Sequence, residues 1–131
     1  QTTVSAIRMT NELDAGPVYL KRKLSLHGSA QEIFESTASL VAKMVKEIAV
    51  REPSPKPQVG QPTVFKRRTP EQGNLTNLPK ATLEKAYDLI RMLDAETYPK
   101  AFLEMNGLRF EFVKTKKLKN KLTAQVEIYK I

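Results

Sequence analysis

Two carboxylates, Glu12 and Asp14, stand two residues apart in the segment NELDAGPVYL (residues 11–20). At that spacing they would share one face of a strand, where two acids can act as general acid and general base. Such a pair also arises by chance, and Asp-Ala-Gly-Pro is typical of a turn between strands. Spacing alone therefore favours a turn residue over a catalyst at Asp14.

Several other reaction centres are excluded by composition. The chain has no cysteine and one histidine, His27, which excludes thiolate catalysis and metal sites built on cysteines or several histidines. We expect His27 to have a structural role at a strand-to-helix junction. No Gly-rich phosphate loop is present. The lack of cysteine favours a reducing, cytoplasmic location, and the apolar runs are far shorter than a membrane span, so no membrane partner is expected.

Phosphate binding is the second candidate chemistry, because the chain carries a net charge of +8. Lysine and arginine outnumber acids by five to two over residues 51–77 and by eleven to seven over residues 78–131, whereas residues 1–50 are nearly neutral. Two basic groups stand out, Lys66-Arg67-Arg68 and five lysines between positions 114 and 121. Such groups suit a polyanionic partner, with a solvated surface as the equally open alternative.

The elements that position these residues follow from the apolar spacing. Ser29 and Glu32 form a capping-box signature for the longer of two predicted helices. Alternation predicts four strands, the last two forming a hairpin whose tip carries the lysines. Residues 98–105 are expected to form a turn with an aromatic anchor. The predicted strands are 3–9, 17–26, 108–113 and 123–130, and the predicted helices are 30–50 and 82–94.

A change of composition divides the chain into three parts. Five of the eight prolines fall within residues 51–77, where the apolar periodicity disappears. Alternate prolines favour an extended, semi-rigid segment, so this stretch is predicted to be a linker that carries the basic cluster. It would separate a first part, residues 1–50, from a helix-plus-hairpin part, residues 78–131.

Three segments resemble the 10-formyltetrahydrofolate-dependent formyltransferases, in particular the methionyl-tRNA formyltransferases and their relatives. They are VSAIRMTNELDAGPVYLKRKLSLHGSAQEIF, FKRRTPEQGNL and YDLIRMLDAETYPKAFLEMNGLRFEF, and they occur in the family's order. The resemblance implies an α/β fragment. In it, residues 1–50 would be the end of a doubly wound formyltransferase domain, followed after the linker by a small α+β subdomain resembling a truncated barrel.

The resemblance also implies roles for individual residues. Asp14 would be the catalytic aspartate that holds and polarises a histidine and a water while an amine attacks the formyl carbon. Its loop, Glu12 to Asp14, would border the 10-formyltetrahydrofolate donor. The family's asparagine and histidine would precede Gln1, so we expect the isolated chain to be inactive. The basic residues expected to contact a phosphate-bearing acceptor are Lys66, Arg67, Arg68, Lys116 and Lys117.

The acceptor stays open between initiator tRNA and a nucleotide-linked amino sugar, because the C-terminal part is shorter than the barrel usual in the tRNA-specific enzymes. A second class of function is a basic binding module without chemistry of its own. In either case, an incomplete domain would leave strand edges exposed, so association between chains is a further expectation.

Overall fold

The computed structural model describes all residues, 1–131, and divides them into two compact units. Unit 1 comprises residues 1–27 and 32–65, and unit 2 comprises residues 28–31 and 66–131. No helix of the chain is both long enough and apolar enough to cross a membrane.

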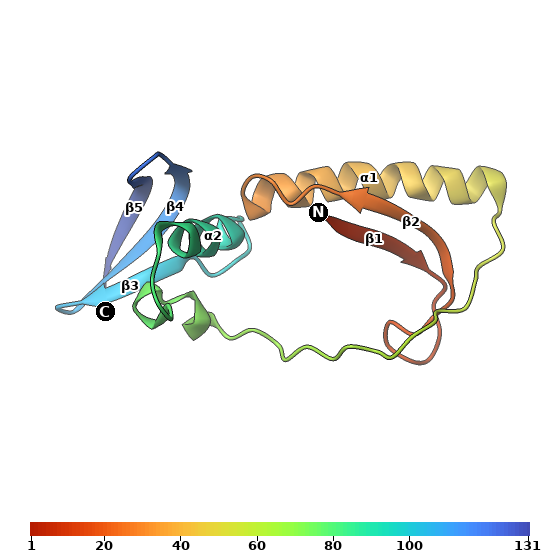
Figure 1. Cartoon of the computed structure of the whole chain (residues 1–131), viewed down its shortest axis with the longest axis horizontal. Helices are drawn as coiled ribbons and strands as arrows, with labels where there is room; N and C mark the ends of the chain where they lie inside the picture. Colours follow the sequence, from red (N-terminus) through yellow and green to blue (C-terminus); the bar gives the residue numbers. More distant parts are fainter. The chain divides into compact units, whose positions relative to one another are not determined.

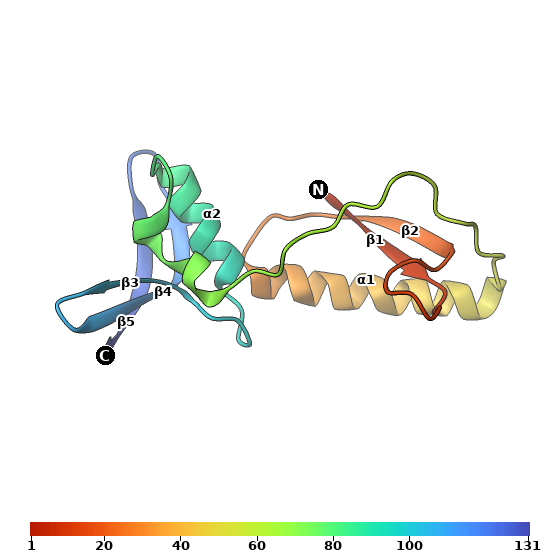
Figure 2. The same cartoon turned by 90° about the horizontal axis from the view of Figure 1, so that it is seen from below.

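Unit 1 consists of a β-hairpin beside a long helix (Figure 1). Strands β1 (Thr2–Ile7) and β2 (Val18–Leu24) pair antiparallel, and α1 (Ala30–Arg51) runs alongside them in both views (Figure 2). The apolar stripe of α1 faces inward, so Ile33 and Met44 are buried together with Leu24 of β2. An ion pair between Arg22 and Glu47 adds a polar link between hairpin and helix.

Unit 2 packs helix α2 (Leu83–Leu93) on a three-stranded antiparallel sheet. The sheet has the order β3 (Ala101–Met105), β4 (Leu108–Lys117), β5 (Leu122–Lys130). Thr82 caps α2 as expected, its hydroxyl accepting a hydrogen bond from the Lys85 amide at 3.3 Å. Ile90 and Leu93 of α2 pack against the fully buried Ala101, and Phe112 joins this cluster.

The turn expected at residues 98–105 is wrong over most of its length. Residues 101–105 form strand β3 instead of a turn, because Asn106 and Gly107 both adopt positive φ and close a two-residue hairpin to β4. The sheet therefore has three strands instead of two, and it does not close into a barrel. Residues 70–77, which belong to the predicted linker, contain the short 3-10 helices η1 (Pro70–Gly73) and η2 (Leu75–Asn77).

The position of the lysines also differs from the expectation. Strand β4 continues to Lys117, so the lysines at 114, 116 and 117 lie in a strand and not at the hairpin tip. A β-bulge between Val113 and Lys116 interrupts the register there. The bulge is anchored to the end of α2, because the Lys114 amide donates a hydrogen bond to an Asp94 carboxylate oxygen at 2.7 Å.

Candidate functional site

The loop that carries Asp14 is closed by backbone contacts. The Arg8 amide donates a hydrogen bond to the Pro17 carbonyl at 2.8 Å, joining the two ends of the loop. Gly16 is required at this closure, because a Cβ there would lie 1.7 Å from the Arg8 carbonyl oxygen. Asp14 itself has φ 56°, a left-handed conformation that Asp adopts more readily than most residues. The turn predicted at residues 14–17 is therefore part of a closed loop, on which the Asp14 side chain is exposed to solvent.

The proline-rich segment holds this loop in place, a contact that the sequence did not reveal. The Gln58 side-chain amide donates hydrogen bonds to the carbonyl oxygens of Asp14 and Gly16, both at 2.8 Å. Next to it, Val18 and Lys56 exchange backbone hydrogen bonds of 2.7 and 2.9 Å. The segment thus pairs with the start of β2, and its Gln58 side chain holds the backbone of the Asp14 loop.

The structure brings Glu12, Leu13 and Asp14 together around one hollow of about 290 Å³, which is lined by residues 7–14 and 16. All three are exposed, Leu13 to 92%. The Asp14 carboxylate makes no hydrogen bond or ion pair within the chain, so it is available to an outside group. His27, the only imidazole, does not line this hollow. The loop therefore offers a carboxylate and an apolar rim, with Arg8 but no imidazole among the lining residues.

The basic cluster lies in unit 2, beside the end of α2. Arg67 and Arg68 line a second hollow of about 480 Å³, together with Leu93 and Tyr98. Arg68 donates a hydrogen bond to the Gln72 carbonyl at 2.9 Å, which ties its guanidinium to η1. Lys66 is exposed and does not line this hollow.

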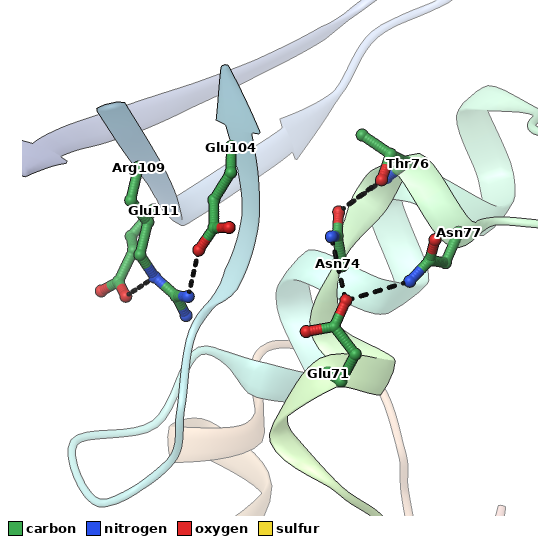
Figure 3. A network of polar contacts seen from close by, with 7 residues as sticks. All are labelled: Glu71, Asn74, Thr76, Asn77, Glu104, Arg109 and Glu111. Carbon is green, nitrogen blue, oxygen red and sulfur yellow. Dashed lines mark hydrogen bonds and ion pairs between the residues drawn. The ribbon is translucent and has the colours of Figure 1, made fainter. Parts of the chain in front are cut away.

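The two 3-10 helices that follow the basic cluster are joined by side-chain hydrogen bonds (Figure 3). Glu71 accepts hydrogen bonds from the side-chain amides of Asn74 at 3.1 Å and Asn77 at 3.2 Å. Asn74 in turn accepts from the Thr76 amide at 3.0 Å. Glu71 is the one acid between residues 66 and 80, and its carboxylate is directed to these amides. The neighbouring arginines keep their positive charge without an acidic partner.

Lys117 lies at the other end of α2, and Lys116 is its neighbour in β4. Lys117 forms an ion pair of 2.9 Å with Glu84 in the first turn of the helix, and this hydrogen bond lowers the pKa of Glu84. Lys116 is exposed, opposite Thr123 in the sheet. Because α2 has eleven residues, its two ends lie about 16 Å apart. The five predicted acceptor residues therefore form two basic groups and not a single site.

Other cations of unit 2 are used within the fold. Arg109 pairs with Glu104 at 2.9 Å and Glu111 at 2.8 Å, and its guanidinium lies 3.6 Å from the centre of the Phe102 ring (Figure 3 shows the two ion pairs). Burial lowers the pKa of Arg109, but the hydrogen bonds to Glu111 and Glu104 outweigh it and raise the pKa overall. Arg109 is therefore a structural cation, unlike the exposed residues at the two ends of α2.

Comparisons with known proteins bear on the family and the fold. Residues 70–129 match the family model described as "Methionyl-tRNA formyltransferase, C-terminal domain". The solved structure of a methionyl-tRNA formyltransferase from Clostridium thermocellum matches with 41% sequence identity and a TM-score of 0.90. The match covers 98% of this chain and 56% of that chain, and it confirms the expected fold class. No curated protein matches the chain significantly. From these two matches, the chain belongs to the methionyl-tRNA formyltransferase family.

Proposed function

We propose that the chain is part of an enzyme that transfers a formyl group from 10-formyltetrahydrofolate to the amine of a methionyl-tRNA. The observation that carries the choice of acceptor is the placement of exposed cations at both ends of α2. Membership of the family supports the reaction, while the chain spans only 56% of the solved relative. The donor and acceptor chemistry is therefore proposed for a longer protein that contains these residues.

The proposed task of the Asp14 loop is to orient a base next to the donor. The donor supplies the formyl carbon that the amine attacks. A carboxylate hydrogen-bonded to an imidazole holds that ring in place and makes it a better proton acceptor. Asp14 suits this role because its carboxylate makes no hydrogen bond or ion pair within the chain and Gln58 holds its backbone. The exposed Leu13 offers the flat apolar contact that a pterin ring would require.

The distance between the basic groups favours an extended acceptor. Successive phosphates of a nucleic acid run along a strand, so one strand can reach cations about 16 Å apart at the two ends of α2. A nucleotide-linked sugar carries its two phosphates side by side and could reach one group only. Arg67 and Arg68 offer guanidinium groups, which bind phosphate oxygens with charge-assisted hydrogen bonds.

The exposed face of α1 supports the view that unit 1 belongs to a larger domain. Val41 and Val45 are 40% and 60% exposed, and with Phe34 and Ala38 they form an apolar stripe beside the buried one. Apolar residues over so wide an arc are typical of a helix that is buried between two layers of structure. We propose that the rest of a catalytic domain covers this stripe, and that residues 1–50 are the end of that domain.

The test is an acceptor assay on the complete protein. It is incubated with 10-formyltetrahydrofolate and either charged initiator tRNA or an amino-sugar nucleotide, and formylated product is measured. We expect formylated product with the charged initiator tRNA and none with the amino-sugar nucleotide. The Asp14→Asn variant should lower kcat by a factor of about 10² to 10⁴, whereas Glu52→Gln, another exposed acid, should not. Formylation of the amino sugar alone would refute the tRNA assignment, and an unaffected Asp14→Asn enzyme would refute the catalytic role.

A further inference from the structure

The hollow that Arg67 and Arg68 line in unit 2 combines positive charge with apolar surface. Nine residues line it, and none of them is acidic. Beside the two arginines, the lining contains Leu93, the aromatic ring of Tyr98 and two prolines. Clefts with apolar walls and a few polar groups are typical of sites for organic ligands. This lining therefore suits a ligand in which an anionic group is joined to a flat apolar one.

Tyr98 is held in place by a closed turn. Its amide donates a hydrogen bond to the carbonyl of Ala95 at 3.1 Å, and Ala95 is only 2% exposed. Pro99 follows, and a residue before proline is largely restricted to extended conformations. Tyr98 is nevertheless 42% exposed. Because the backbone is fixed and the side chain has few rotatable bonds, a flat ligand can stack on the ring at a small cost in entropy.

The two arginines are joined to the 3-10 helix η1. The Arg68 guanidinium donates a hydrogen bond to the Gln72 carbonyl, and the Thr69 amide donates one to the Gln72 side-chain oxygen, both at 2.9 Å. The guanidinium of Arg67 and the remaining N–H groups of Arg68 can bind an anion. Guanidinium groups suit phosphate, because they bind its oxygens through paired, charge-assisted hydrogen bonds.

The size of the hollow restricts the ligand further. Its volume of about 480 Å³ lies within the range of roughly 300–1,000 Å³ that is usual for sites of small organic molecules. It admits a nucleotide base together with its phosphate, but not a double helix. In a duplex the faces of each base are covered by its neighbours, so stacking on an aromatic side chain requires an unpaired base.

We propose that one unpaired nucleotide of the RNA acceptor binds in this hollow, with its base stacked on Tyr98 and its phosphate bound by Arg67 and Arg68. The choice of RNA as the source of the nucleotide rests on the proposed function, in which exposed cations at both ends of α2 bind tRNA. Stacking tolerates any base, because every base has an aromatic face. The hollow thus selects a single-stranded stretch of RNA and not a particular sequence.

A fluorescence experiment tests the stacking directly. The chain contains no tryptophan, so the Tyr98→Trp variant carries one indole, at the hollow. A short single-stranded oligouridylate should quench its fluorescence, whereas the duplex of that strand with oligoadenylate should not. Tyr129→Trp is the matched control, because Tyr129 is 46% exposed and lies on β5, outside the hollow. Neither RNA should quench this control.

The affinity for oligouridylate gives a second readout. Tyr98→Leu keeps an apolar side chain but removes the ring, so we expect binding to weaken about 5- to 100-fold, the effect of losing one stacked base. Tyr98→Phe keeps the ring and should bind as the wild type does, and circular dichroism checks that each variant is folded. Equal affinities of the wild type and a folded Tyr98→Leu variant would overturn the proposed site. Equal quenching of Tyr98→Trp by duplex and single strand would also overturn it.

A third ligand separates the two sources of a nucleotide. If uridine diphosphate quenched Tyr98→Trp and oligouridylate did not, the RNA assignment would be overturned in favour of a nucleotide-linked acceptor. None of these measurements requires formyl transfer. A protein that formylates charged tRNA while no RNA quenches Tyr98→Trp would therefore lose this site and keep its proposed function. Formylation of the amino sugar alone would instead refute the proposed function.

Discussion

Removing the Gln58 side chain tests how the Asp14 loop is held. The side-chain amide makes two hydrogen bonds of 2.8 Å, to the carbonyls of Asp14 and Gly16. A neutral hydrogen bond contributes about 1 kcal/mol net. Because Gln58 is exposed, we expect Gln58→Ala to destabilise the closed loop by about 1–2 kcal/mol, which increases its opening roughly 5- to 30-fold.

Amide hydrogen exchange measures this opening directly. The Arg8 amide is the reporter, because it is bonded to the Pro17 carbonyl only while the loop is closed. Gln61→Ala is the matched control, since it removes the same side chain from the same segment at an exposed position with no hydrogen bond to the loop. Exchange at Arg8 should accelerate in the Gln58 variant alone. Equal exchange in both variants would refute the proposed clamp.

Three further predictions concern unit 2. The pKa of Glu84 is lowered by its hydrogen bond with Lys117, so the pair should stabilise the fold at neutral pH and lose this effect as the pH falls through the lowered pKa. An NMR titration of Lys117→Gln should show the Glu84 pKa rising. Phe102→Ala should cost about 3–5 kcal/mol in urea unfolding, because the ring is 2% exposed. Gly73→Ala should cost about 1 kcal/mol in the same assay, since a Cβ would lie 3.1 Å from Leu93; no loss in either variant would contradict this packing.

Most elements of the fold follow from periodicity in the sequence. Helix α2 begins one residue after Thr82 as its cap predicts, and α1 ends within a residue of the expected position. Strand β3 was not predicted, although Asn106-Gly107 is a strong signal for a two-residue hairpin. The segment is short and begins just after Pro99, so alternation alone was too weak to indicate a strand.

The candidate sites were predictable only in part. The residues from Glu12 to Asp14 are adjacent in sequence and line one hollow. The Gln58 clamp joins positions more than forty residues apart, for which no sequence spacing gives a signal. The separation of the two basic groups could not be predicted from sequence spacing either, because it depends on tertiary packing of β4 against α2, which holds Lys117 next to Glu84.

The central claim, that unit 2 binds tRNA through cations at both ends of α2, is tested most directly by the salt dependence of tRNA binding. Each phosphate contact contributes about 0.7–0.9 to the slope of log K against log salt. Arg67→Gln/Arg68→Gln and Lys116→Gln/Lys117→Gln should therefore each reduce the slope by about 1.5. The control Lys43→Gln/Lys46→Gln removes the same charge from exposed positions of α1 and should leave it unchanged. The claim would be contradicted if the wild type and all three double variants had the same slope. It would also be contradicted if only one of the two variants at the ends of α2 changed the slope.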